Sequence, residues 1–302
     1  MPCALLLLLW TATAPAAADQ ISVVATSTDL KALVEAVGGD RVRVESLAPP
    51  LHDPHALELK PVQLAKIKAA DLLVRIGLDH EPWLSRALRT LNDPRFVRES
   101  RHYLDTSRRI ELLQSETPRL KTDRRAHLHG FGNPHYWLDP ANGKPISSAI
   151  TEALARLVPG EQLYFEGKRK QFLEQLDNRL ERWSRQMAPY KGIRAVAVHE
   201  TWPYFARRFG LVIVAVVEPT PGVPPSPSYL TGLIQKMRET GIKLLIAEPY
   251  SNASVVKQVA AQSGATAVTL IPSVGGDPRA SDYLSLFEFN IERLSRLAAA
   301  RS

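Results

Sequence analysis

The chain has 302 residues, of which 45% are hydrophobic and 23% are charged, and its formal net charge is +7. This composition excludes a disordered or fibrous chain, and the length is sufficient for two domains of ordinary size. The charge does not indicate nucleic acid, because residues 167–186, GKRKQFLEQLDNRLERWSRQ, carry both signs on one polar helix face. No finger or RNP motif occurs in the sequence, so we expect a solvated basic surface and no nucleic-acid partner.

The first 18 residues are typical of a secretory signal. An apolar run from Ala4 to Trp10 precedes small residues that end at Ala18, although no Lys or Arg opens the segment, which is atypical. The single cysteine, Cys3, lies inside this signal without a lipobox, so the mature chain is predicted to have no thiol and no lipid anchor. No other apolar stretch approaches the ~20 residues of a membrane helix. We therefore expect a soluble, monomeric periplasmic protein.

The first half alternates short apolar runs with helical patterns. Strand-like runs lie at 21–26, 41–47 and 71–77. Helical periodicity separates them, as in DLKALVEAVGG and PVQLAKIKAA. Because strands that alternate with helices build parallel sheets, residues 19–145 are predicted to form an N-terminal α/β domain.

Residues 146–190 are predicted to link two domains. The periodicity is helical from about Pro145 to Met187 and is interrupted at residues 159–162, PGEQ, where Pro159 suits the first turn of a new helix. The second of these helices is long, polar and highly charged. Such a composition is expected of a helix that spans two domains.

The α/β pattern restarts in residues 191–302, the predicted C-terminal domain. Strands are expected at 193–198, 211–217, 243–249 and 266–271, and helices near 203–209, 226–240, 252–263 and 282–299. The predicted fold is therefore two α/β domains with mainly parallel sheets, joined by a long rigid helix.

Three histidines stand at element ends far apart in the sequence. His55 follows the second strand-like run, His135 lies in the Pro-framed loop NPHYWLDP, and His199 ends the run at 193–198. Ligands of open α/β sheets bind beyond the carboxyl ends of strands, and two such domains form a cleft between them. We therefore expect the three side chains to converge there on one metal ion or one reactive centre. Imidazoles suit Zn²⁺ better than Mn²⁺, which prefers more oxygen.

Five motifs together resemble a known family. They are, in chain order, DPHALELKP, ADLLVRIGLDHEPWL, NPHYWLDP, HETWPYFARRFGL and IKLLIAEP. They are similar to motifs of the ZnuA-like, or cluster A-I, zinc and manganese substrate-binding proteins of ABC transporters. The resemblance implies a periplasmic protein that holds Zn²⁺ between two α/β domains and delivers it to an ABC permease in the inner membrane. It also implies that His55, His135 and His199 are the metal ligands, and a histidine at the third position favours zinc.

The resemblance leaves the fourth ligand open. Many relatives carry an Asp-Pro pair after the last strand, where this chain has Ile271 and Pro272. A three-histidine site completed by water is our first choice, and Glu248 or Asp277 are the alternatives. A site completed by water would be more open than one with four protein ligands, which could ease release.

Other polar residues near the motifs have two interpretations each. His127 and His129 either form a short metal-capture loop or are ordinary surface residues. Asp139 either accepts a hydrogen bond from a ligand imidazole or caps the helix that follows it. His52 lies beside one motif and His80 lies within another, and neither aligns with a ligand position.

Two alternatives to a zinc carrier follow from the same residues. An exported zinc-dependent hydrolase also uses three histidines and an open position. Such an enzyme needs a general base beside the metal-bound water, however, and no HExxH or comparable motif occurs in the sequence. A manganese-binding member of the same family is the second alternative. We expect a carrier and not an enzyme.

Overall fold

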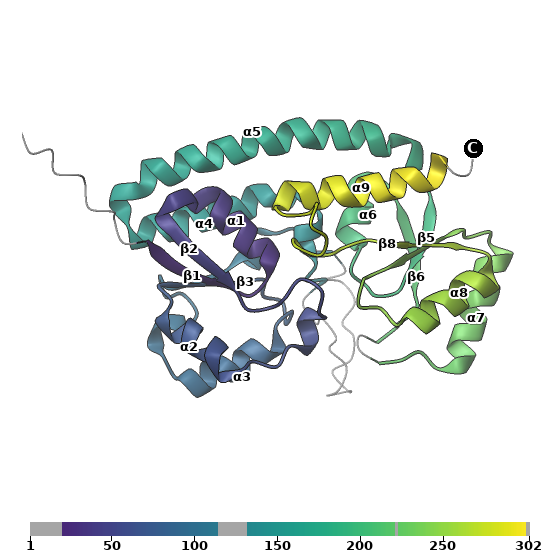
Figure 1. Ribbon diagram of the computed structural model, residues 1–302, viewed down its shortest axis with the longest axis horizontal. Helices are drawn as coiled ribbons and strands as arrows, with labels where there is room; N and C mark the ends of the chain where they lie inside the picture. The colour runs from purple at the N-terminus through teal and green to yellow at the C-terminus, as the bar shows by residue number, and fades with distance from the viewer. Residues whose placement is uncertain (1–19, 114–131, 221–222, 300–302) are drawn as a thin grey trace, which may run out of the picture.

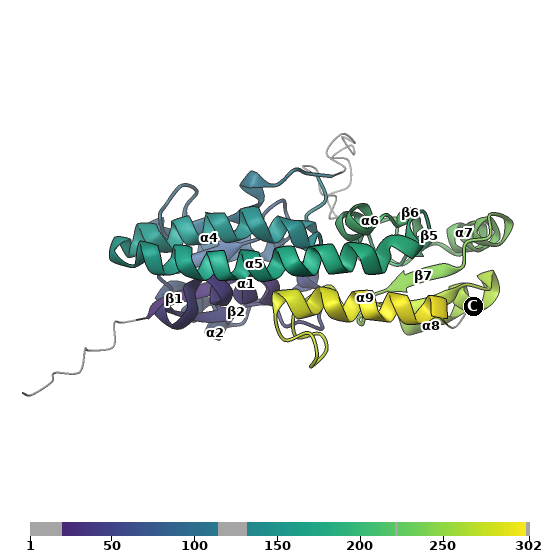
Figure 2. The same ribbon diagram turned by 90° about the horizontal axis from the view of Figure 1, so that it is seen from above.

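The computed structural model describes residues 20–113, 132–220 and 223–299. The predicted signal, His127 and His129 lie outside these residues. Figures 1 and 2 show an elongated molecule in which two α/β halves lie side by side, with one long helix along both. Within the described ranges, no helix combines the length and apolar composition that crossing a membrane requires.

The N-terminal half contains a parallel four-stranded sheet with the order β2-β1-β3-β4. Its strands are β1 (Ile21–Ala25), β2 (Val42–Ser46), β3 (Leu72–Arg75) and β4 (Tyr103–Asp105). One face of the sheet is covered by α1 (Thr28–Gly38) and α4 (Gly143–Leu157), and the other by α2 (Pro61–Ala69) and α3 (Pro82–Leu91). The three strands predicted in this half are confirmed, whereas β4 and α3 were not predicted.

The C-terminal half repeats this arrangement with the order β6-β5-β7-β8. Its strands are β5 (Arg194–Ala197), β6 (Val212–Val216), β7 (Leu244–Ala247) and β8 (Thr266–Thr269). One face is covered by α6 (Pro203–Phe209) and α9 (Tyr283–Ala299), and the other by α7 (Pro227–Glu239) and α8 (Ala253–Ser263). The predicted α/β class and the parallel sheets are therefore confirmed, and all four predicted strands of this half are present.

Helix α5 (Gln162–Met187) joins the two halves. Its buried side chains recur at intervals of seven and four residues and so form one stripe: Phe165, Phe172, Leu176, Trp183 and Met187. This stripe packs on α1 and α4 in the N-terminal half and on α9 in the C-terminal half (Figure 2). At a rise of 1.5 Å per residue the helix is about 39 Å long, enough to brace both halves.

The two halves share one hydrophobic core. A single cluster of buried side chains contains residues of both sheets together with Tyr136, Trp137 and Leu138. Trp137 Nε1 donates a hydrogen bond of 2.9 Å to the carbonyl oxygen of Pro272, and the Tyr283 hydroxyl donates one of 2.7 Å to the carbonyl oxygen of Trp137. The halves are thus fixed to each other by buried contacts, and the domain limits given above stay a prediction.

Asp29 makes a second buried connection between the halves. The side chain is fully buried, and its Oδ1 accepts a hydrogen bond of 2.9 Å from the backbone N–H of Val274, 245 residues away. Burial raises the pKa of Asp29 from 3.8 to about 7, although hydrogen bonds from Val274, Ser273 and Ser27 oppose the rise. The folded protein therefore holds a proton here at pH values where the unfolded chain has lost it.

Asp29→Asn is expected to be more stable than the parent protein at pH 8. Because the pKa of Asp29 is 3.8 when unfolded and about 7 when folded, the stabilisation from its proton is complete below the lower value and lost as the pH rises through the upper one. Between pH 5 and pH 8 the parent should lose about 3 kcal/mol of unfolding free energy at this site. Urea denaturation at both pH values measures the loss.

Because asparagine does not ionise, the Asp29→Asn variant should not lose this unfolding free energy between pH 5 and pH 8. The matched control is Glu239→Gln, an exposed position on α7, which should follow the pH dependence of the parent protein. Equal pH dependence of the parent and Asp29→Asn would contradict the prediction.

Candidate metal centre

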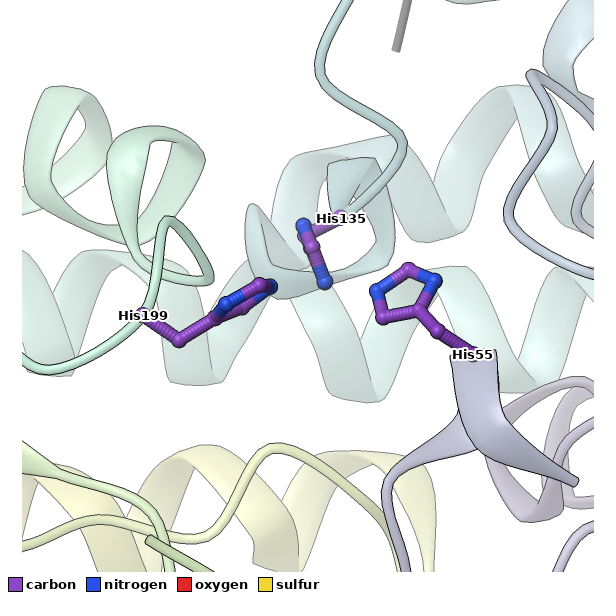
Figure 3. Close-up of side chains that lie close together, drawn as sticks. All are labelled: His55, His135 and His199. Carbon is purple, nitrogen blue, oxygen red and sulfur yellow. The ribbon is translucent and has the colours of Figure 1, made fainter. Parts of the chain in front are cut away.

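His55 is held in a short turn after β2. The turn is the 3₁₀ helix at Pro54–Ala56, and the Asp53 side chain caps it by accepting a hydrogen bond of 2.9 Å from the backbone N–H of His55. The carbonyl oxygen of Pro54 accepts a hydrogen bond of 2.8 Å from Trp83 Nε1. These contacts fix the backbone of the turn, so that the buried imidazole of His55 faces the C-terminal half (Figure 3).

His135 lies between the two halves, at the start of the 3₁₀ helix Tyr136–Leu138. Asn133 Oδ1 accepts a hydrogen bond of 2.9 Å from the backbone N–H of His135 and lies 3.1 Å from its Nδ1. The amide nitrogen of Asn133 donates a hydrogen bond of 2.8 Å to the carbonyl oxygen of Glu200. Asn133 therefore orients His135 and ties it to the loop that carries the third histidine. This role of Asn133 could not be predicted from the sequence, because it depends on contacts between distant segments.

His199 lies beyond the carboxyl end of β5, the edge at which ligands of open α/β sheets bind. The ring is buried, with an exposed fraction of 8%, and its Nδ1 lies 3.8 Å from Glu218 Oε2. Its Nε2 is buried and has no hydrogen-bond partner among the described residues. A buried nitrogen of this kind is costly in an apolar setting, and binding a metal ion would remove the cost.

The structure brings His55, His135 and His199 together. The ring centroids of His55 and His135 lie 5.5 Å apart. The centroid of His199 lies 5.7 Å from that of His55 and 5.6 Å from that of His135. One nitrogen from each ring lies within 4.8 Å of the others, and Figure 3 shows three such nitrogens facing a shared space. Zinc binds imidazole nitrogens at 2.0–2.1 Å, so an ion could sit among them with small shifts of the rings.

The hydrogen bonds indicate which nitrogen faces that space. His55 Nδ1 donates to the carbonyl oxygen of His80 at 3.0 Å, and His135 Nδ1 faces Asn133 Oδ1. An imidazole that donates through Nδ1 is neutral when its Nε2 carries a lone pair, which is the form that binds metals. The arrangement therefore directs Nε2 lone pairs of His55 and His135 toward the centre.

Carboxylates surround the third histidine. Burial of the His199 ring lowers its pKa, but Glu218, Glu248 and Asp53 outweigh this and raise the pKa above 6.5. The same three carboxylates line a cavity of about 200 Å³ beside His199, together with Tyr250. The potential at this side of the centre is negative, which attracts a cation.

Glu248 and Asp277, the two side chains considered as fourth ligands, are engaged elsewhere. Glu248 is buried and accepts hydrogen bonds of 2.8 Å from Trp202 Nε1 and 2.8 Å from the Ser251 hydroxyl. Asp277 accepts bonds of 3.0 Å and 3.1 Å from the backbone N–H and Nε of Arg279. In the described part of the chain, the group of side chains spaced to hold a metal contains neither residue.

The Asp139 carboxylate is engaged by Arg208 and by the backbone of Ala141. It forms a two-point ion pair with Arg208, at 2.6 Å and 2.8 Å, and caps the next turn by accepting a bond of 2.9 Å from the N–H of Ala141. The capping interpretation holds, whereas Asn133, and not Asp139, is the residue beside His135 Nδ1.

His80 is the residue of this region that sequence reasoning left unassigned. Its ring is 1% exposed, and its centroid lies 4.5 Å from that of His55, 5.4 Å from that of His135 and 5.0 Å from that of Trp137. One signal was available, because His80 follows the carboxyl end of β3 as His55 follows β2 and His199 follows β5.

Comparisons with known proteins show which proteins this chain is similar to. The ZnuA uptake protein of Paracoccus denitrificans is 28% identical over 270 residues, which are 83% of each chain. The manganese ABC transporter substrate-binding lipoprotein PsaA of Streptococcus pneumoniae is 23% identical over 92% of this chain and 88% of its own. A crystal structure of ZnuA matches with a TM-score of 0.76 and 26% identity, over 92% of this chain and 99% of that one. The model of the family described as zinc-uptake complex component A, periplasmic, matches residues 23–297, and the chain therefore belongs to this ZnuA family.

Proposed function

We propose that this protein captures Zn²⁺ in the periplasm and delivers it, as a monomer, to an ABC permease of the inner membrane. The observation that carries the proposal is the convergence of three buried imidazoles from different parts of the fold, His55, His135 and His199. Three histidines and one further donor form a usual tetrahedral zinc site. Membership of a family of ABC transporter substrate-binding proteins supports delivery to a permease.

The donor set supports zinc in preference to manganese. Imidazole nitrogen suits zinc, copper, iron and nickel, whereas Mn²⁺ takes sites rich in carboxylate, carbonyl and water oxygens. The three clustered donors are all nitrogens, and the nearby carboxylate of Glu248 is held by Trp202 and Ser251. Relatives named for zinc and for manganese both occur, so the donor chemistry and not the family is the argument for the metal.

A carrier is supported over a hydrolase by the space around the histidines. Pockets that hold organic ligands usually measure about 300–1,000 Å³. The cavity beside His199 measures about 200 Å³ and is lined by Asp53, Glu218 and Glu248. Such a cavity suits a hydrated cation, which the carboxylates attract. It leaves little room for an organic substrate.

Metal analysis and competitive titration of the mature chain test the proposal. Protein stripped with a chelator and reloaded should hold one zinc ion per chain, and zinc should displace bound manganese. Tighter binding of manganese would favour the manganese-binding alternative, and the absence of a stoichiometric metal would refute a carrier of either ion. Turnover of ester or peptide substrates by the zinc-loaded protein would instead favour the hydrolase.

A second experiment tests delivery. Proteoliposomes that contain the ABC permease encoded by the same organism should take up zinc only when the loaded protein and ATP are both present. Uptake at the same rate without the protein would contradict the proposed partnership.

A further inference from the structure

His80 lies against two of the three clustered histidines. Its imidazole is 1% exposed and packs edge-on against His55, His135 and Trp137, at interplanar angles of 73°, 86° and 69°. Histidine is intermediate among residue types in how often it is fully buried, and a polar ring is costly to bury without partners in the fold. Sequence motifs assign no role to His80, so a role has to be inferred from its position in the structure.

The spacing of His80 from two of the three clustered rings fits a site of four imidazoles, although the three rings already grouped around the shared space are those of His55, His135 and His199. Four histidines around one tetrahedral zinc, with nitrogens 2.0–2.1 Å from the ion, have ring centroids about 5 Å apart. The three clustered rings are separated by 5.5, 5.7 and 5.6 Å, and His80 lies 4.5 Å and 5.4 Å from two of them. The fourth ring therefore stands at the distance that a fourth donor needs from His55 and His135.

The backbone before His80 is held in an unfavourable conformation. Gly77, Leu78 and Asp79 have positive φ angles of 85°, 54° and 56°. A left-handed residue other than glycine costs about 1–2 kcal/mol, and two stand here in succession. Strain of this kind persists where the surroundings enforce it, and it concentrates at ligand sites. The strained turn determines where the His80 ring enters the core.

The residue after His80 enforces this turn. The Glu81 carboxylate is buried and accepts hydrogen bonds from the backbone N–H groups of Ile76 and Gly77, at 2.7 Å and 3.1 Å. It also accepts bonds from the Thr26 hydroxyl, at 2.6 Å, and from Arg75 Nη2, at 3.0 Å. A carboxylate with four donors is firmly fixed. It holds the turn at residues 76–81 closed, and this turn determines the position of the His80 ring.

We propose that His80 supplies the fourth nitrogen to the bound ion, in place of water, by turning from edge contact with His55 into coordination. The inference rests on the proposed zinc carriage. It goes beyond the three histidines because Glu248 and Asp277 are engaged by other groups. A set of four imidazoles offers no oxygen donor, so His80 also strengthens the preference for Zn²⁺ over Mn²⁺.

Nitrogen NMR spectra of protein labelled in its histidine rings test the proposal. In the zinc-loaded parent, four imidazole nitrogens should show the shift of a metal-bound nitrogen. His80→Phe, which keeps a ring against Trp137 and removes both donors, should lose one of the four signals. Its dissociation constant for zinc should rise by at least about 100-fold, beyond the ~10–100-fold loss typical of a residue that only positions a ligand.

The controls separate this proposal from zinc carriage itself. His52→Phe changes an exposed neighbour of the site and should leave both the spectrum and the affinity unchanged. Three bound imidazoles in the parent, or unchanged affinity in His80→Phe, would overturn the role of His80 and leave a three-histidine carrier intact. No stoichiometric zinc in the parent would overturn both. The count in the parent decides the matter even if His80→Phe does not fold.

Discussion

His135→Ala is expected to raise the dissociation constant for Zn²⁺ by at least about 100-fold. Four-ligand zinc sites bind with roughly 10–16 kcal/mol, so one ligand accounts for about 3 kcal/mol. His135 is the proposed ligand that lies between the two halves, with its ring centroid 5.5 Å from that of His55 and 5.6 Å from that of His199. Without the His135 imidazole, only the nitrogens of His55 and His199 would remain of the three clustered donors. Competition against a zinc-binding dye measures the change.

His102→Ala is the matched control for this experiment. His102 lies on the rim of the N-terminal sheet, where its Nδ1 contacts the carbonyl oxygen of Asp71 at 2.7 Å. Its loss should leave the zinc affinity within a factor of about two. Circular dichroism of the stripped proteins should establish that both variants are folded. Equal zinc affinity of the parent and His135→Ala would contradict the proposed site.

Glu81→Ala is expected to lower the free energy of unfolding by about 3–5 kcal/mol, because it leaves a buried charge without its partner. Arg75 is 12% exposed and its guanidinium lies 3.0 Å from the Glu81 carboxylate. The substitution also removes the acceptor of the Ile76 and Gly77 N–H groups and of the Thr26 hydroxyl. Urea denaturation of the metal-free protein measures the loss.

Two further variants sharpen the result. Asp79→Asn lies two positions away, is exposed and keeps a residue type that tolerates positive φ, so its stability should stay within about 0.5 kcal/mol of the parent. Replacing both partners with apolar residues, as in Arg75→Met with Glu81→Leu, should recover part of the loss. A loss below about 1 kcal/mol in Glu81→Ala would show that the carboxylate does not hold the loop.

Much of the fold could be predicted because its signals are local. The apolar strands β1 and β7 and the long polar helix α5 each follow from the period of their own residues. Strand β4 could not be predicted in this way, because it has only three residues at a sheet edge. The turn before His80 was equally hidden, since Leu78 is not a residue that signals positive φ.

In the candidate site, too, the features that follow from local sequence could be predicted and those that depend on distant contacts could not. His55 and His199 follow strands β2 and β5, so parallel topology alone directs both to one edge of each sheet. The polar contacts around the histidines form only in the folded chain. Arg208, which engages Asp139, is 69 residues away from it, and Asn133 acts through the carbonyl oxygen of Glu200, 67 residues away. The spacing of residues in the sequence does not predict which residues form such pairs.

The hydrophobic cluster that the two halves share couples metal binding to the stability of the whole chain. Because buried residues of both sheets belong to one cluster, the halves should unfold together and not in turn. An ion bound to histidines from both halves stabilises the whole chain, by about 4 kcal/mol at a free concentration 1,000 times the dissociation constant. The empty protein is then the form that proteases should degrade first. Zinc supply would thus set not only how many carriers are loaded but how long each one survives.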